Sequence, residues 1–70
     1  MINVTEISKR LSEAIKTSGK SQSEIARSLG VNHSQISRYV SGEKMPSIET
    51  LANLCVILDV DPADILCVND

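Results

Sequence analysis

Aromatic side chains are nearly absent from this 70-residue sequence, which has no Trp, no Phe and a single Tyr, Tyr39. Leu, Ile and Val must therefore supply most of the apolar core, and that composition suits packed helices. A chain of this length buries only about 60% of the surface that its unfolded form exposes, so its core has to be simple and regular. We expect a single domain.

Cysteine, histidine and long apolar runs are also scarce. Cys55 and Cys67 are too few to hold together a secreted miniprotein, and we expect both to act as small hydrophobic residues. One histidine cannot complete an ordinary zinc site, so we expect neither a metal nor another cofactor. No run approaches the roughly 20 apolar residues that span a bilayer, and residues 1–6 lack the features of a signal peptide. We therefore expect a cytoplasmic protein with no membrane partner.

Basic residues are absent from positions 45–70, which hold five acids. All seven Lys and Arg residues lie at positions 9–44 beside three acids, so this segment carries a net charge of +4. The overall charge of −2 argues against a nucleic-acid partner, but the uneven distribution reverses that argument. A polyanion would be met by one end of the molecule.

Start and stop signals predict five helices. A capping box formed by Ser21 and Glu24, an N-cap residue at Asn32 and a first-turn Pro62 mark three of the starts. No stretch shows the sustained alternation of a strand, so the predicted fold class is all-α. The predicted helices cover about residues 5–17, 21–29, 32–41, 47–58 and 61–67.

Residues 22–42 carry the functional signal. Two helices that cross at a sharp angle need a small residue where they approach, Ala26, and a turn residue suited to positive φ, Gly30. Val31 and Ile36 then hold the second helix against the first. With Ile36 at the centre of the buried side, helical geometry places Tyr39, Val40 and His33 within about 60° of it. The outward side is polar and nearly free of acids, which suits a helix in a DNA major groove; it holds Ser34, Ser37, Arg38 and Ser41.

The stretch from Ser21 to Val31, followed by Ile36, Ser37 and Gly42, resembles the lambda-repressor/Cro-like (Xre) helix-turn-helix family. Segments 46–51 and 59–66 are similar to the fourth and fifth helices of that family, so the resemblance covers about residues 5–67. It implies a five-helix lambda-repressor-like DNA-binding domain with the helix-turn-helix at helices 2 and 3, whose third helix reads bases. The resemblance assigns base contacts to His33, Ser34, Ser37 and Arg38, and phosphate contacts to Gln22, Asn32 and Lys44.

Two features, one pair of residues and one single residue, depart from the pattern of that family. The family often pairs an Arg late in the first helix with a Glu at the end of the third, where this chain has Ile15 and Val40. Replacement of an ion pair by an apolar pair should be neutral or favourable for stability. Lys20 occupies a position that is often apolar, and its stem can cover the core edge while its charge meets solvent or phosphate.

The predicted function is a sequence-specific double-stranded-DNA-binding transcriptional regulator, most simply a repressor. The alternative is an antitoxin-type or other protein-interaction module of the same fold that binds a partner protein. Residues 14–21 fit a loose phosphate-loop pattern, but that motif needs a preceding buried strand, and its first half here lies in a predicted helix. We interpret the match as chance and expect no enzyme.

Surplus apolar residues predict a homodimer on a near-palindromic operator. A short recognition surface discriminates little alone, and two copies about 34–36 Å apart would multiply that discrimination. The predicted buried stripe of the fourth helix consists of Ile48, Leu51, Leu54, Cys55 and Leu58. Residues off that stripe or near the chain end are the expected dimer contacts: Val56, Ile57 and Val68.

Overall fold

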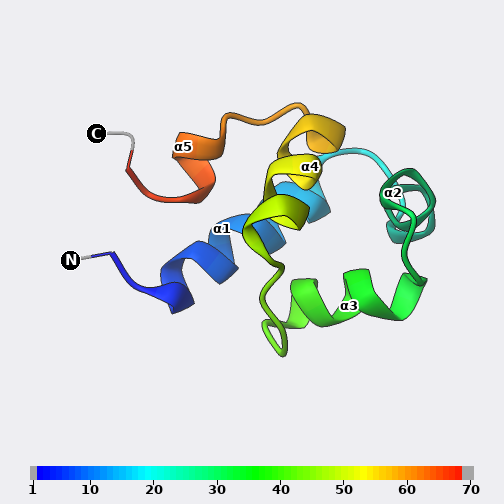
Figure 1. The fold of residues 1–70 in the computed structure, drawn as a ribbon, viewed down its shortest axis with the longest axis horizontal. Coiled ribbons are helices and arrows are strands. Elements are labelled where there is room, and N and C mark those ends of the chain that lie inside the picture. Colours follow the sequence, from blue (N-terminus) through cyan, green and yellow to red (C-terminus); the bar gives the residue numbers. More distant parts are fainter. Residues whose placement is uncertain (1, 69–70) are drawn as a thin grey trace.

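The computed structural model describes residues 2–68. This part of the chain contains five α-helices, joined by turns and loops, and no strand (Figure 1). Helix α1 packs against α3 and α5, while α2 packs against α3 and α4. The all-α, five-helix prediction is confirmed. The helices are α1 (Val4–Thr17), α2 (Gln22–Leu29), α3 (His33–Ser41), α4 (Ile48–Leu58) and α5 (Pro62–Ile65).

The first four helices lie close to their predicted ranges, but the fifth is shorter than predicted. Helix α5 ends at Ile65, and the N–H of Leu66 donates to the carbonyl of Pro62 to close its single turn. Cys67 then takes a φ of 62°, in the left-handed region, which breaks the helical path. The prediction of a helix reaching residue 67 was therefore wrong.

Side chains cap the starts of four helices, as the sequence signals indicated. The predicted capping box is present: the N–H of Glu24 donates to Ser21 Oγ and the N–H of Ser21 donates to Glu24 Oε1, both at 3.1 Å. Asn32 occupies the N-cap position of α3 as predicted, yet its side chain makes no capping hydrogen bond. The other three capping side chains are Asn3, Ser47 and Asp61.

The capping box gives the stability of the domain a pH dependence. Hydrogen bonds from the backbone and side chain of Ser21 hold the pKa of Glu24 below its ordinary value. A lowered folded-state pKa contributes stability above the unfolded pKa, and this contribution is lost as the pH falls through the folded pKa. Below about pH 4.3, the ordinary glutamate value, the protein should therefore lose stability through this group.

Glu24→Gln tests this contribution, because glutamine preserves the capping geometry without titrating. The free energy of unfolding of the variant, measured in urea from pH 7 to pH 3, should fall less on acidification than that of the wild type. Glu13→Gln, at an exposed α1 glutamate outside any cap, is the control and should follow the wild-type curve. If the stability of the Glu24→Gln variant falls as much on acidification as that of the wild type, Glu24 does not cause the pH dependence.

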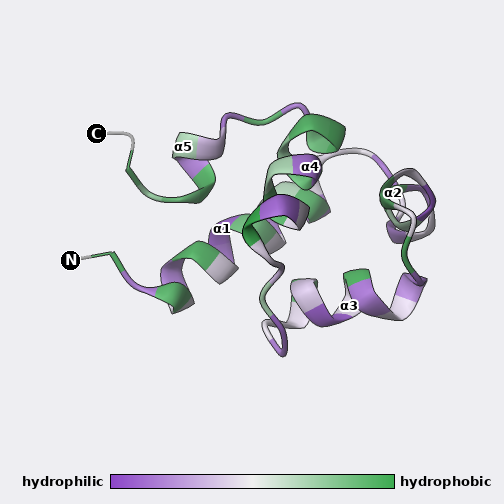
Figure 2. Cartoon of the chain, viewed as in Figure 1, coloured by the Kyte–Doolittle hydropathy of each residue, from purple (hydrophilic) through white to green (hydrophobic). Residues whose placement is uncertain are grey.

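The core is aliphatic except for Cys55 and Tyr39, and the hydroxyl of Tyr39 accepts a hydrogen bond from Gln35 Nε2 at 3.2 Å. Figure 2 shows the contrast between the largely hydrophobic α4 and the more polar α3. The predicted stripe of α4 is buried apart from Ile48, which is 88% exposed. Ile48 is the first residue of α4, and helical side chains lean toward the N-terminus, so it extends past the packed region. The buried apolar residues are Leu11, Ile15, Ile25, Ala26, Ile36, Tyr39, Leu51, Leu54, Cys55, Leu58 and Ile65.

Candidate nucleic-acid interface

A three-residue turn, residues 30–32, joins α2 to α3. Gly30 has a φ of 80°, and its N–H and that of Val31 donate to the carbonyl of Ala26 at 2.8 and 3.0 Å. This is the left-handed glycine ending that lets a helix stop and the chain change direction. A Cβ on Gly30 would meet no atom within 4 Å, so glycine is required there for backbone conformation and not for space. The turn predicted at Gly30 is confirmed.

Helix α3 has one side in the core and the opposite side at the surface. Ile36 is fully buried and Tyr39 nearly so, while Val40 is half-buried. We call the exposed side, with the half-buried Ser37 included, the outer face of α3. It consists of His33, Ser34, Ser37, Arg38 and Ser41.

His33 lies on the outer face although helical geometry placed it near the buried side. The cause is the same as for Ile48: His33 is the first residue of its helix, so no neighbouring element covers the turn before it. The four residues assigned to base contacts are thus brought onto one surface. His33 is therefore exposed although it lies within about 60° of Ile36 around the helix.

Ser37 and Gln22 form a direct contact that the sequence analysis did not foresee. Ser37 Oγ donates to Gln22 Oε1 at 2.7 Å, and both residues are half-buried. The hydrogen bond ties the first residue of α2 to the middle of α3. Within residues 2–68, the Nε2 of Gln22 makes no hydrogen bond, so the amide can still donate to an acceptor outside the protein.

The three predicted phosphate contacts flank the outer face. Gln22 begins α2, Asn32 precedes α3, and Lys44 follows α3. Asn32 and Lys44 are exposed, and the amide of Asn32 is not used for capping. Donors therefore lie before and after α3 along the chain.

Arg38 carries an ion pair at the end of the outer face. Its Nε lies 3.5 Å from Oε2 of Glu43, and both side chains are more than half exposed. This surface was predicted to be nearly free of acids, and the ion pair with Glu43 was not predicted. The sequence feature that could have predicted this ion pair is the position of Glu43 directly after Gly42, the residue that ends α3.

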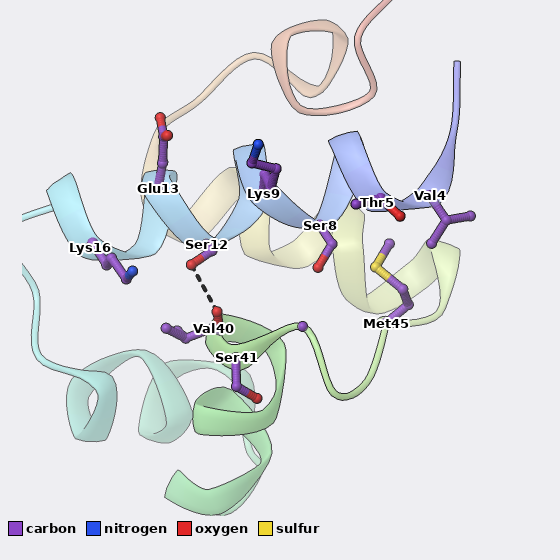
Figure 3. A pocket seen from close by; sticks show the side chains of 11 residues that line it. Val4, Thr5, Ser8, Lys9, Ser12, Glu13, Lys16, Val40, Ser41 and Met45 are labelled. Carbon is purple, nitrogen blue, oxygen red and sulfur yellow. Dashed lines mark hydrogen bonds between the residues drawn. The ribbon is translucent and has the colours of Figure 1, made fainter. Parts of the chain in front are cut away.

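A buried hydrogen bond anchors α3 to α1 (Figure 3). Ser12 is the one buried polar residue among residues 2–68, and its Oγ donates to the carbonyl of Val40 at 2.9 Å. This bond satisfies a carbonyl in the last turn of α3 that has no partner in the helix itself. Around it lies an open groove of about 480 Å³, whose lining includes Lys9, Lys16, Ser41 and Met45. The anchor holds the end of the outer face at a fixed position relative to α1.

The described part of the chain shows no other chemical site. No group of three potential metal-ligating side chains gathers within residues 2–68. No helix of this part is long and apolar enough to cross a membrane. Cys55 is 3% exposed and lies in the core, as expected. Burial, with the nearby charge of Asp61, raises the pKa of its thiol. Cys67 is half-buried, and neither cysteine is in a disulfide.

Comparisons with known proteins identify the fold. A family model described as helix-turn-helix matches residues 11–65. The chain belongs to the lambda-repressor-like helix-turn-helix family. The resemblance seen in the sequence is thereby confirmed. No curated protein sequence matches the chain.

Two solved structures share this helix-turn-helix fold. One is the SOS-response transcriptional repressor LexA from Eubacterium rectale, with a TM-score of 0.77 and 26% identity. That match covers 89% of this chain and 66% of the LexA chain, just under two thirds. The other is the restriction-modification controller protein C.AhdI from Aeromonas hydrophila, with a TM-score of 0.73, 25% identity, and coverage of 86% and 91%.

Proposed function

We propose that this protein binds specific double-stranded DNA sequences with α3 in the major groove and thereby regulates transcription, most simply as a repressor. The observation that carries the proposal is the outer face of α3, a short polar surface on a helix whose other side is fixed in the core. The major groove of B-DNA admits an α-helix and presents a distinct pattern of donors and acceptors for each base pair. The LexA and C.AhdI structures, described as a repressor and a controller protein, support the same function.

The polar residues of the outer face and those that flank it suit different kinds of contact. Arg38 has the planar fork of donors that matches O6 and N7 of guanine. His33, Ser34 and Ser37 are short enough to bring the helix close to the base edges. Gln22, Asn32 and Lys44 would bind phosphates on either side and so fix the register of the helix, as phosphate contacts generally do.

Selection of bound duplexes from random DNA by the purified protein tests this function. The selected pool should converge on a short half-site repeated in inverted orientation, because two copies of the domain would read it. A pool that shows no enriched sequence would contradict sequence-specific binding. Failure to retain any duplex would favour the protein-interaction module of the same fold.

We further propose that the protein acts as a homodimer through the exposed side of α4. Ile48, Ala52 and Val56 recur every four residues on that helix and are all exposed, with Val56 at 79% and Ile48 at 88%. Val68, near the chain end, is also exposed, whereas Ile57 is half-buried and packs against the core. We therefore propose Ile48, Val56 and Val68, and not Ile57, as the dimer contacts, because the first three are exposed.

Val56→Asp should abolish dimerisation while leaving the helical content unchanged, because the side chain is exposed and a buried like-charge pair at a symmetric interface is costly. Sedimentation of the protein bound to its selected duplex should show two chains per site for the wild type and one for the variant. Val4→Asp, at another exposed valine on α1, should retain two. A single wild-type chain on a saturated site would overturn the dimer.

A further inference from the structure

The guanidinium of Arg38 is held by an acid of its own chain at the place where the protein would read bases. Two backbone bonds fix the position of that acid. The N–H of Glu43 donates to the carbonyl of Arg38 at 3.0 Å, and the N–H of Gly42, which has a φ of 80°, donates to the carbonyl of Tyr39 at 3.3 Å. This is the Schellman ending of a helix, in which the N–H of the second residue past the helix end donates to a carbonyl in the last turn. The carboxylate of Glu43 therefore stays within reach of Arg38.

We propose that Glu43 is a specificity-determining residue, which suppresses binding to non-cognate DNA by competing for Arg38. The proposal rests on the proposed function, because it assumes that Arg38 faces DNA bases. It assigns to Glu43 a role opposite to that of the basic residues around it. Glu43 lowers the affinity of the protein for every DNA sequence, and it lowers the affinity for the cognate sequence least.

The competition follows from the geometry of the three possible partners of Arg38. On non-cognate DNA, a phosphate can form only an ion pair with Arg38, and the carboxylate of Glu43 already forms one. The negative carboxylate also repels the phosphate. On a cognate site, guanine offers two hydrogen bonds in a fixed plane, which only the matching base provides. Exchange of the carboxylate for guanine is therefore favourable, while exchange for a phosphate is not.

The size of the effect follows from the exposure of the pair. Ion pairs between exposed side chains alter equilibrium constants by up to about fivefold. We expect Glu43→Gln to raise affinity for random-sequence duplex about two- to fivefold and affinity for the selected duplex by less. The ratio of the two affinities should fall accordingly.

Glu6→Gln provides a matched control. Glu6 forms the other Arg–Glu ion pair of residues 2–68, with Arg10 at 3.8 Å, and its side chain is also half exposed. It lies on α1 and not on the outer face. Both variants remove one negative charge and one exposed ion pair, so a difference between them reports position alone. The Glu6→Gln variant should keep the wild-type affinity ratio.

The experiment measures binding of five proteins to the selected duplex and to a random-sequence duplex at one salt concentration: wild type, Glu43→Gln, Glu6→Gln, Arg38→Ala and the Arg38→Ala/Glu43→Gln double variant. In the Arg38→Ala background, Glu43→Gln should raise both affinities by the same factor, since no guanidinium remains to be held. Circular dichroism should show equal helical content throughout, because Glu43 is exposed and its backbone bonds are untouched.

Each remaining outcome is decisive. A wild type that binds no duplex overturns the proposed function and this inference together. A wild type that binds selectively, with an unchanged ratio for Glu43→Gln, overturns the role of Glu43 alone. A ratio that falls because affinity for the selected duplex drops would also overturn it, since Glu43 would then support Arg38 instead of competing for it.

Discussion

Arg38→Ala should erase the preference for one base pair in each half-site and weaken binding to the selected duplex by about 1–3 kcal/mol. The reason is that a guanidinium paired with guanine discriminates against every other base, whereas the serines of the outer face have short side chains that bond to several bases. Selection from random DNA by the variant, compared position by position with the wild-type selection, measures the change. An unchanged preferred sequence would remove Arg38 from base recognition.

Lys44→Ala is the appropriate contrast to Arg38→Ala. Lys44 is exposed just beyond α3, and loss of a phosphate contact should weaken all sequences about equally. Gln22→Ala is less clean, because Gln22 also accepts the hydrogen bond of Ser37 and its loss would release a residue of the outer face. A Lys44→Ala variant with an altered sequence preference would contradict the separation of base-contacting from phosphate-contacting residues.

Affinity for the selected duplex should fall on the order of a thousandfold between 50 and 200 mM salt, the loss typical of about six neutralised phosphates per complex. The charge that supports this estimate is the net +4 of residues 9–44 in each of two copies. Each neutralised phosphate releases condensed counterions, and added salt opposes that release. The measurement is the slope of log affinity against log salt. A flat slope would contradict phosphate binding, and a slope half as steep would indicate one copy per site.

The sequence predicted those features of the fold that depend on local chemistry. The capping box at Ser21, the turn at Gly30 and the burial of Ile36 each follow from the conformational needs of neighbouring residues. Periodicity failed at the first residues of helices. His33 and Ile48 have the angular position of buried residues but lie where no other helix covers them. Whether the first residue of a helix is covered depends on tertiary packing, which a helical wheel does not contain.

The candidate site was predicted as a set of residues but not as a set of contacts. The bond between Ser37 and Gln22 joins side chains 15 positions apart, so it depends on the angle between α2 and α3. The half-burial of Ile57 likewise depends on how α4 meets its neighbours. The pairing of Arg38 with Glu43 is local and could have been predicted from the sequence. In a glycine ending, the backbone N–H of the residue after the glycine bonds to a carbonyl in the last turn, which brings that residue close to Arg38.

The most direct test of α3 as the DNA-reading element is a titration of ¹⁵N-labelled protein with its selected duplex, followed by amide chemical shifts. The largest changes should fall on residues 32–44 and on the first turn of α2, because these carry the outer face and its flanking donors. The amides of α5, on the far side of α1, should change least. Shifts centred on α4 and α5, with α3 unaffected, would contradict the account.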